Sequence, residues 1–275
     1  MIDLKRNSKK QPVLANGLRT KSCSSYTPNQ KQDYKISRGR FSNFLTCKRC
    51  FYLDRVMGLD VPGTPGWTLN ETTDFLYKKE FDYCRKKQIP HRLFISNNLK
   101  HFVPYNHPEI ENWRNSRHKG LTLRYKNTNI ILTGGVDDIW QDTISKKLII
   151  ADYKSQAKIG MVNKKDYLED PYHEAYKIQM DFYAYLLLGM GYEVDNCSYF
   201  LVCNAKRSDQ EFNKKLNFDE YLIPYKWKIN WIEDELDKMI SLMNNQKMPN
   251  FNLSCKNCAY SEQYARLINK DGRYF

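Results

Sequence analysis

The chain has 275 residues, of which 41% are hydrophobic and 14% aromatic. This length suits one large domain, or one domain with an appendage, and the composition is compatible with a folded core. Its 44 Lys and Arg residues exceed its 31 Asp and Glu residues, which leaves a formal charge of +13. Such a charge favours a polyanionic partner, nucleic acid first and an anionic membrane second, although a general solubility effect is an alternative.

The sequence contains neither a membrane span nor a secretory signal. The longest apolar stretch, Tyr183–Tyr192, is far shorter than the roughly 20 residues that a membrane-spanning helix needs. The N-terminus has no apolar segment of the kind that signal peptides carry. We therefore expect a cytoplasmic protein that does not enter a membrane. In a reducing compartment, its eight cysteines suit metal or cluster binding better than disulfides.

The N-terminal segment is polar and basic. Residues 1–33 show no useful hydrophobic periodicity, and basic residues occur throughout them, at Lys5, Arg6, Lys9, Lys10, Arg19, Lys21 and Lys31. We predict a disordered arm that contacts phosphates. Residues 34–260 then form the folded domain, and residues 261–275 form a C-terminal tail.

Two helices are predicted next. The first spans Ile36–Leu59, because apolar residues recur there at helical spacing and Ser37 is a suitable N-cap. The segment Asp60–Trp67, with two prolines and two glycines, ends this helix. The second helix follows over Leu69–Lys87.

The centre of the chain is predicted to be β-structure. Three strands with short connections cover residues 121–125, 129–140 and 146–154, and a long helix follows, with Asp170 as its N-cap. Two more strands and a last helix over roughly residues 226–245 complete the pattern. This order indicates an α/β protein with one mixed central sheet flanked by helices.

Acidic residues and a lysine lie together at the strand ends. Side chains alternate between the two faces of a strand, so Asp152 and Lys154 point one way and Tyr153 points the other way. The carboxylate can bind a hard cation such as Mg²⁺, and the lysine can position a water or stabilise charge on a phosphate. The alternative is an ordinary surface ion pair.

A second carboxylate is available from the preceding strand. It is supplied by Asp137 or Asp138, and periodicity cannot choose between them because Gly134 and Gly135 are able to introduce a bulge.

Three short motifs occur in the order used by a known family: Gly135-Val136-Asp137, Asp152-Tyr153-Lys154 and Gln179-x-x-x-Tyr183. Together they resemble the PD-(D/E)XK nuclease superfamily, and most closely its RecB-like branch, which includes the CRISPR-associated RecB-like exonucleases. The resemblance extends over about residues 36–259. It implies a restriction-endonuclease-like fold with a mixed central sheet flanked by helices.

The resemblance also implies roles for five residues. Asp137 and Asp152 match the metal-binding acids, and Lys154 matches the catalytic lysine. Gln179 and Tyr183 match a catalytic pair near the substrate strand, and their spacing of four places them on one face of a helix. Without the other motifs, the pair would be read as ordinary packing of an amphipathic helix.

The family also carries an acid or a histidine on its first core helix, where a further metal ligand can lie. This chain offers Asp74, Glu80 and Asp82 there. We favour Glu80, because it shares a helical face with Leu76 and Tyr83. A solvated helix charge is an equal alternative for Glu80.

Four cysteines form two C-x-x-C pairs near the two ends of the domain, Cys47 with Cys50 and Cys255 with Cys258. Four thiolates suffice for tetrahedral Zn²⁺ or for an iron–sulfur cluster. The resemblance implies a [4Fe–4S] cluster that joins the termini, with Cys47 at the cluster position. The family has three C-terminal cysteines where this chain has two, so Zn²⁺ stays open, as do unligated thiols. The remaining cysteines look unpaired: Cys23, Cys84, Cys197 and Cys203.

The function expected from these features is a metal-dependent DNA nuclease that uses Mg²⁺ or Mn²⁺. We expect an exonuclease that acts on single strands or DNA ends, in DNA repair, recombination or related processing. Two alternatives are a non-catalytic module that binds nucleic acid or a partner on a nuclease-like fold, and a cysteine-based redox sensor. Neither a particular protein partner nor an oligomeric state follows from the sequence.

Overall fold

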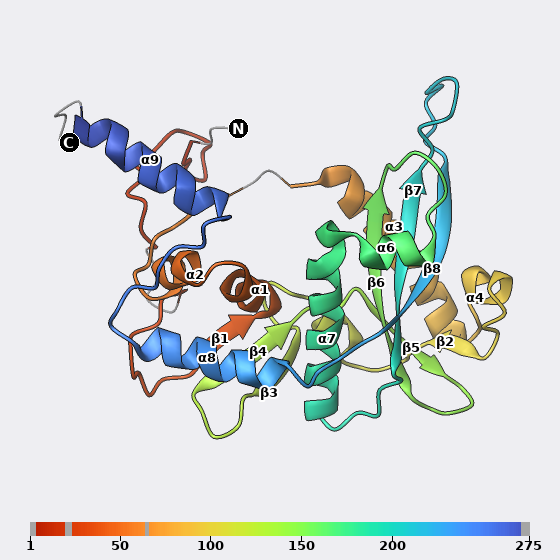
Figure 1. The fold of residues 1–275 in the computed structure, drawn as a ribbon. Helices are drawn as coiled ribbons and strands as arrows, with labels where there is room; N and C mark the ends of the chain where they lie inside the picture. The colour runs from red at the N-terminus through yellow and green to blue at the C-terminus, as the bar shows by residue number, and fades with distance from the viewer. Residues whose placement is uncertain (1–3, 20–23, 64–65, 271–275) are drawn as a thin grey trace. The chain divides into compact units, whose positions relative to one another are not determined.

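The structure is a computed structural model that describes residues 4–19, 24–63 and 66–270. The chain separates into two compact units (Figure 1). The first unit comprises Met1–Gly66, Asn127–Ile130 and Glu233–Phe275, and the second comprises Trp67–Lys126 and Ile131–Ile232. Each unit is described by itself.

The first unit is built mainly from helices. Strand β1 (Tyr34–Ser37) leads into α1 (Arg38–Thr46) and α2 (Lys48–Arg55), and the C-terminal part of the chain adds α8 (Ile232–Asn244) and α9 (Lys256–Lys270). The side chain of Ser37 accepts a hydrogen bond from the backbone N–H of Arg40, which confirms the predicted N-cap. The aromatic rings of Phe41, Phe44 and Phe51 are buried in this unit.

The single helix predicted over Ile36–Leu59 is wrong, because the chain breaks at Cys47. This residue adopts an extended conformation, with φ −155° and ψ 105°, so it ends α1 and begins α2. The hydrophobic periodicity continues across the break, which is why the sequence does not reveal it.

Parts of the predicted N-terminal arm and C-terminal tail can be followed. Arg6 and Pro12 form a short β-bridge, and Leu18 pairs in the same way with Leu59. Residues 1–3 and 20–23, which include Lys21 and Cys23, lie outside the described residues, and the disordered arm stays a prediction. Residues 261–270 of the predicted tail belong to α9, and residues 271–275 are not described.

The second unit contains the predicted mixed sheet. Its five strands are β2 (Phe102–Pro104), β5 (Asp138–Asp142), β6 (Leu148–Gln156), β7 (Cys197–Ala205) and β8 (Phe218–Lys226), in the order β2-β5-β6-β7-β8. Only the pairing of β6 with β7 is parallel, and the other three are antiparallel. Because β8 continues to residue 226, the helix predicted to start there begins only at Ile232.

The remaining elements of this unit surround the sheet. Strands β3 (Leu121–Arg124) and β4 (Ile130–Gly134) pair antiparallel outside it. The helices are α3 (Thr68–Lys87), α4 (Arg92–Ser96), α5 (Ile110–Arg114), α6 (Lys164–Glu169) and α7 (Glu174–Gly189). Asp170 caps a short 3₁₀ turn, Pro171–His173, and α7 starts just after that turn.

The predicted continuous strand over residues 129–140 is also wrong. The chain leaves β4 at Gly134 and enters β5 at Asp138, in a different sheet. A Cβ atom at Gly135 would lie 2.4 Å from the side chain of Ser116, so only glycine allows the chain to pass there. The diglycine therefore separates two strands and does not form a bulge within one.

The two faces of β6 have different chemistry. Ile149, Ala151 and Tyr153 join an aromatic cluster with Tyr77 and Phe81 of α3. In that cluster the rings of Phe81 and Trp140 stack with centroids 5.4 Å apart. The alternation of a strand then directs Asp152 and Lys154 to the opposite face, which α7 covers (Figure 1).

Among the described residues, none of the helices combines the length and the apolar character that crossing a membrane requires.

We expect the aromatic cluster to dominate the stability of the second unit. Phe81→Ala removes a fully buried ring and should lower the free energy of unfolding by about 3–5 kcal/mol. Phe75→Ala is the matched control, because it lies on the same helix with 56% of its surface exposed and should cost less than about 0.5 kcal/mol. Urea denaturation followed by circular dichroism measures both values, and equal losses would contradict the assigned core.

Candidate functional site

The predicted acids meet where β5 begins beside β6. Asp138 pairs with Ala151 in the register of these strands, so Asp137 lies beside Asp152. The backbone N–H of Tyr153 donates a hydrogen bond to the carboxylate of Asp137 at 2.9 Å. The chain therefore brings two carboxylates together although they are fifteen residues apart in sequence.

Asp152 is fully buried in a mixed environment. Gln179 donates a hydrogen bond to its Oδ1 atom, and its Oδ2 atom faces the ammonium group of Lys154. Beyond that ion pair, Oδ2 receives no hydrogen bond of ordinary geometry from the described residues. Burial raises the pKa of Asp152, and the nearby charge of Asp137 adds to this rise, while Lys154 opposes it.

Lys154 lies between the acids and an aromatic ring. Its ammonium group pairs with Asp152 and lies 4.5 Å from the ring centroid of Tyr176. Burial lowers the pKa of Lys154, but the charges of Asp152 and Asp137 outweigh burial, so the net shift is upward. The side chain is 17% exposed. A positively charged group is thus held next to the acids.

Asp138 points to the other side of the sheet. Its carboxylate is bound by the guanidinium groups of Arg85 and Arg114 and by the hydroxyl of Tyr153. Burial would raise the pKa of Asp138, but the charges of Arg114 and Arg85 outweigh it and lower the pKa. The carboxylate of Asp138 is therefore paired with two guanidinium groups, whereas the carboxylate of Asp137 lies next to Asp152.

Gln179 and Tyr183 lie on the face of α7 that covers this site. The Gln179 amide donates to the Tyr183 hydroxyl at 3.1 Å, and that hydroxyl donates to the carbonyl oxygen of Gly135. A Cβ atom at Gly134 would lie 2.7 Å from the Tyr183 ring. The absence of a side chain at Gly134 thus allows α7 to approach the segment that leads into Asp137.

The acid favoured on the first core helix, Glu80, lies in a different cluster. Its carboxylate contacts His91 at 3.0 Å and Arg92 at 3.2 Å. Asp74, another acid of α3, is electrostatically coupled to the site. Burial raises the pKa of Asp74, and the charge of Asp137 raises it further. Asp82, the third acid considered, pairs with Arg85 and Arg114.

One residue near the site has no motif that would reveal it. Tyr167 of α6 is buried, and its hydroxyl has no hydrogen-bond partner among the described residues. Burial raises the pKa of this hydroxyl, and the charge of Asp152 contributes to the rise. Its ring packs between His173 and Phe200, so packing brings it towards the acids.

The donor atoms at this site suit a divalent cation. Asp137 and Asp152 crowd two carboxylates together, and an oxygen of Asp152 is buried without an ordinary hydrogen bond. A cation relieves such crowding, and carboxylate oxygens are the ligands that Mg²⁺ and Mn²⁺ prefer. The residues present therefore fit the metal ion that the sequence motifs imply.

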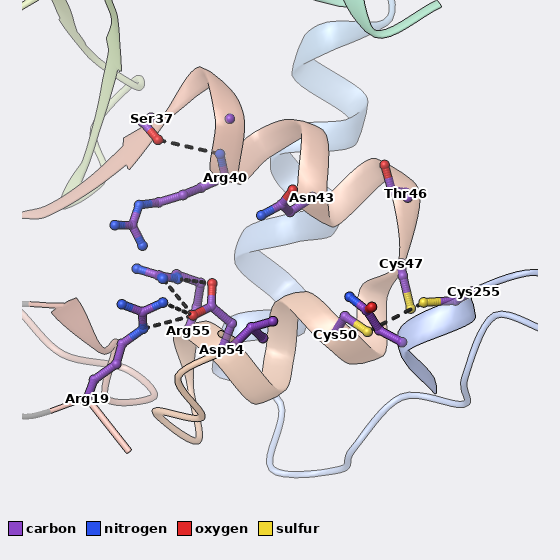
Figure 2. Close-up of a pocket in the computed structure, with 13 residues that line it drawn as sticks. Arg19, Ser37, Arg40, Asn43, Thr46, Cys47, Cys50, Asp54, Arg55 and Cys255 are labelled. Carbon is purple, nitrogen blue, oxygen red and sulfur yellow. Dashed lines mark hydrogen bonds and ion pairs between the residues drawn. The ribbon is translucent and has the colours of Figure 1, made fainter. Parts of the chain in front are cut away.

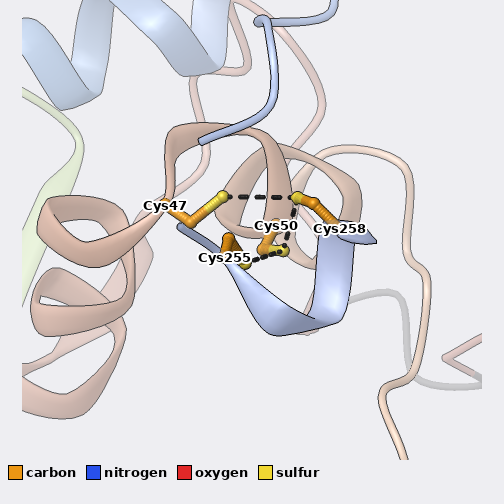
Figure 3. Close-up of side chains that lie close together, drawn as sticks. All are labelled: Cys47, Cys50, Cys255 and Cys258. Atoms are coloured by element: carbon orange, nitrogen blue, oxygen red, sulfur yellow. Dashed lines mark hydrogen bonds between the residues drawn. The ribbon is translucent and has the colours of Figure 1, made fainter. Parts of the chain in front are cut away.

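The four cysteines of the two pairs gather at a second place, within the first unit (Figure 3). Cys47 and Cys258 have their sulfur atoms 3.6 Å apart, and Cys50 lies 3.6 Å from Cys255 and 3.4 Å from Cys258. All four sulfurs lie within 4.8 Å of one another. Cys84, Cys197 and Cys203 are free thiols outside this group, and Cys23 is not described.

Both cysteine pairs lie at helix N-termini. Cys47 precedes α2, and Cys255 precedes α9, so each pair is close to the positive end of a helix dipole. Burial raises the pKa of Cys47, but backbone N–H donors from Cys50 and Asn252 outweigh burial and lower it to about 7. Burial and the neighbouring thiols raise the pKa of Cys50, and burial raises that of Cys258 to about 11. A bound metal would stabilise the thiolate form of all four, which is the form that binds a metal.

Comparison with models of known protein families agrees with this arrangement. A model of the PD-(D/E)XK nuclease superfamily matches residues 71–263, well over half of the chain. The curated proteins compared with the chain include no match. Among solved structures, a "Putative exonuclease" from Eubacterium rectale is 14% identical in sequence, with a TM-score of 0.41 over 89% of this chain and 94% of its own. The superfamily match includes the five strands of the sheet and α7.

The two neighbouring acids should differ sharply in their effect on stability. Asp138→Asn leaves Arg85 and Arg114 without a buried counter-charge and should lower the free energy of unfolding by about 3–5 kcal/mol. Asp137→Asn keeps an acceptor for the N–H of Tyr153 and relieves repulsion with Asp152, so it should change stability by less than about 1 kcal/mol.

Chemical denaturation of both variants in metal-free buffer tests this expectation. A larger loss for Asp137→Asn than for Asp138→Asn would mean that the roles of the two acids are reversed.

Proposed function

Because this chain belongs to the PD-(D/E)XK nuclease superfamily, we propose that it is a divalent-metal-dependent nuclease that hydrolyses phosphodiester bonds in DNA. The observation that carries the proposal is the pairing of two crowded carboxylates, Asp137 and Asp152, with the charged Lys154. A merely structural ion pair would not require the second acid. The donor set and the positive charge are those that phosphoryl transfer uses.

In this proposal Asp137 and Asp152 hold Mg²⁺ or Mn²⁺. A bound divalent cation supplies Lewis-acid stabilisation of the negative charge on the phosphate. Asp74 replaces Glu80 as the acid of α3 that completes the site, because the charge of Asp137 acts on Asp74. Asp74 forms an ion pair with Lys78 at 2.8 Å, while Glu80 is engaged by His91 and Arg92.

Lys154 acts on the reacting groups. Its ammonium group donates hydrogen bonds to a phosphate oxygen or orients the attacking water, so no covalent intermediate with the protein forms. Asp152 and the ring of Tyr176 hold it in place from two sides. Because its pKa is raised, Lys154 stays protonated at neutral pH and is suited to stabilise negative charge.

Gln179 and Tyr183 position the other groups. Gln179 holds one oxygen of Asp152, which leaves the second oxygen directed towards Lys154. Tyr183 binds the carbonyl of Gly135, two residues before Asp137. The helix α7 therefore aligns Asp137, which directly precedes β5, with Asp152 of β6.

The substrate we propose is DNA with free ends or single-stranded character, cleaved as an exonuclease. The charge of +13 supports a polyanionic substrate. Tyr172, just before α7, is 89% exposed and offers a ring on which an unpaired base can stack. A place in the RecB-like branch and a role in repair or recombination belong to the same proposal, with residues 34–260 as the nuclease domain.

A non-catalytic nucleic-acid-binding module is the second candidate. Such a module has no need for Asp137, Asp152 and Lys154 as a set, yet all three occur together here. Their arrangement supports turnover over binding alone.

For the cysteine site we propose Zn²⁺ in preference to a [4Fe–4S] cluster. Zinc–sulfur bonds of about 2.3 Å place four tetrahedral thiolates about 3.8 Å apart. Three of the six sulfur separations are 3.4–3.6 Å, close to that value, and all six are within 4.8 Å. A cubane cluster puts four irons and four sulfides between its thiolates and holds them further apart.

Cleavage of end-labelled DNA tests the nuclease proposal. Wild-type protein should cut single- or double-stranded DNA with Mg²⁺ or Mn²⁺, and not after chelation of the metal. Asp152→Asn and Lys154→Gln should each lower the rate roughly 100-fold or more, because each removes a positioned charge. A ladder that shortens from one end identifies exonuclease action.

Two matched variants on α3 serve as controls in this assay. Asp74→Asn should lower the rate more than Glu80→Gln, since the charge of Asp137 acts on Asp74 whereas Glu80 is bound by His91 and Arg92. If the wild type binds DNA but does not cleave it, the nuclease proposal is contradicted and the non-catalytic binding module is favoured.

Metal analysis of protein purified without oxygen tests the cysteine site. We expect about one zinc per chain, no iron and no visible absorption. Cys258→Ser should lose the zinc and melt at lower temperature, because metal binding contributes to folding. The control Cys203→Ser, a buried thiol of β7, should keep the zinc. Iron and acid-labile sulfide in the wild type would overturn the zinc assignment.

A further inference from the structure

A cavity of about 520 Å³ opens in the first unit beside the cysteine site. Its wall comes from Arg19 of the N-terminal segment, from α1 and α2, and from the start of α9. Figure 2 shows the guanidinium groups of Arg19, Arg40 and Arg55 gathered on one side of this cavity, around Asp54. Three cations therefore face one carboxylate.

Two of the three arginines fully occupy that carboxylate. Arg19 donates to Asp54 through Nε and one terminal nitrogen, and Arg55 does the same. Arg55 also donates to the carbonyl of Ser24 at 3.0 Å. Asp60 adds a second acid at 3.2 Å from Arg19, but its side chain is 52% exposed. Both carboxylate oxygens of Asp54 thus accept hydrogen bonds from Arg19 or Arg55.

Arg40 feels the charge of Asp54 but forms no ion pair with it among the residues that the structure describes. Its Nη1 atom is buried and has no acceptor among the residues that the structure describes. Burial lowers the pKa of Arg40 and outweighs the opposing effects of Tyr34 and Asp54, while the charge of Arg19 lowers it further. An unpaired guanidinium nitrogen beside two other arginines is costly, and a bound anion removes that cost.

The start of α1 makes the same cavity more attractive to anions. Ser37 and Gly39, the N-cap and second residue of this nine-residue helix, line the cavity, and the first turn has no acidic residue. The positive end of the helix dipole therefore adds to the arginine charges. A Cβ atom at Gly39 would meet no atom within 4 Å, so there is open space directly in front of this turn.

We propose that this cavity binds a phosphate group of a nucleic-acid strand, with Arg40 as its principal ligand. The inference rests on the proposed function for the identity of the strand, since the charge and open space of the cavity by themselves favour an anion. Guanidinium groups bind phosphate through two parallel hydrogen bonds. Arg40 is the arginine whose hydrogen-bonding capacity is still available.

The residues that line the cavity also indicate that it does not recognise bases. The residues that form it include polar side chains such as Asn43 and Asn257 but no aromatic ring. Single-stranded nucleic acid is bound through stacking on aromatic rings and through charge. Without stacking, only backbone recognition is left, which is independent of base sequence.

Binding of a fluorescent single-stranded oligonucleotide tests the proposal, in the full chain and without added divalent metal so that cleavage does not interfere. Arg40→Gln should weaken binding on the order of tenfold and make it less dependent on salt, because one phosphate contact is lost. Two oligonucleotides of different base composition should be affected equally.

The matched control is Arg49→Gln, which removes the same charge from α2. Arg49 lies over the ring of Phe251, 5.8 Å from its centroid, and does not line the cavity. It should weaken binding about twofold or less. Equal effects of Arg40→Gln and Arg49→Gln would overturn the proposal in favour of general attraction by net charge.

A second variant covers the case in which Arg40→Gln does not fold. Gly39→Glu keeps every arginine, improves helix propensity and places a carboxylate in the open space before Arg40. It should keep the metal of the cysteine site and the melting temperature of the wild type while weakening oligonucleotide binding on the order of tenfold. Unchanged binding by this folded variant would also overturn the proposal.

Titration with inorganic phosphate separates two sources of the same ligand. Stabilisation of the wild type by phosphate, lost in Arg40→Gln, with oligonucleotide binding unaffected in that variant, would show a site for free phosphate and overturn the nucleic-acid assignment. These binding results do not depend on turnover. Loss of cleavage in every assay would therefore refute the proposed nuclease and leave the phosphate site to be judged by its own data.

Discussion

The buried carboxylate of Asp138 is the charge on which the second unit depends. It receives guanidinium groups from α3 and α5, through Arg85 and Arg114, and a hydroxyl from β6, through Tyr153. A buried carboxylate is tolerated only when its partners are complete. One residue at the start of β5 therefore fixes two helices and a neighbouring strand. Because a strand alternates its faces, the same constraint turns Asp137 away from the arginines and towards Asp152.

The opposite face of the sheet has the reverse character. Asp152 is as buried as Asp138, yet it meets a second carboxylate, one lysine and one amide. Such incomplete pairing is destabilising and persists only where the surrounding structure enforces it. The aromatic cluster around Phe81 and the network around Asp138 supply that enforcement from the other side of β6. The two faces of the sheet thus have different roles. The face with the aromatic cluster and Asp138 stabilises the sheet, and the face with Asp152 and Lys154 keeps charges in an arrangement that favours binding of a cation and a phosphate.

Much of this arrangement could be predicted from the sequence, because it follows from local periodicity. The alternation of β6 predicted the common direction of Asp152 and Lys154, and helical spacing predicted that Gln179 and Tyr183 share a face. The misjudged features depend on tertiary contacts. The preference for Glu80 rests on the helical face that it shares with Leu76 and Tyr83, and both of those side chains are more than half exposed. The buried face is that of Tyr77 and Phe81, with Asp74 three residues before Tyr77. The breaks at Cys47 and Gly135 likewise come from a thiol cluster and a close approach that no local pattern contains.

The helix α1 links the two features of the first unit. It begins at Ser37, on the wall of the arginine cavity, and ends at Thr46, next to the first cysteine of the thiol group. Nine residues of helix are short enough to be marginal without tertiary support. The support comes from Phe41 and Phe44 in the core and from Asn252, whose side chain donates to the carbonyl of Thr46 at 2.9 Å. The metal proposed for the four thiolates would fix the C-terminal end of this helix, and with it the direction of the N-terminal end. The position of Arg40 in the cavity is therefore coupled to a site formed by two segments more than two hundred residues apart.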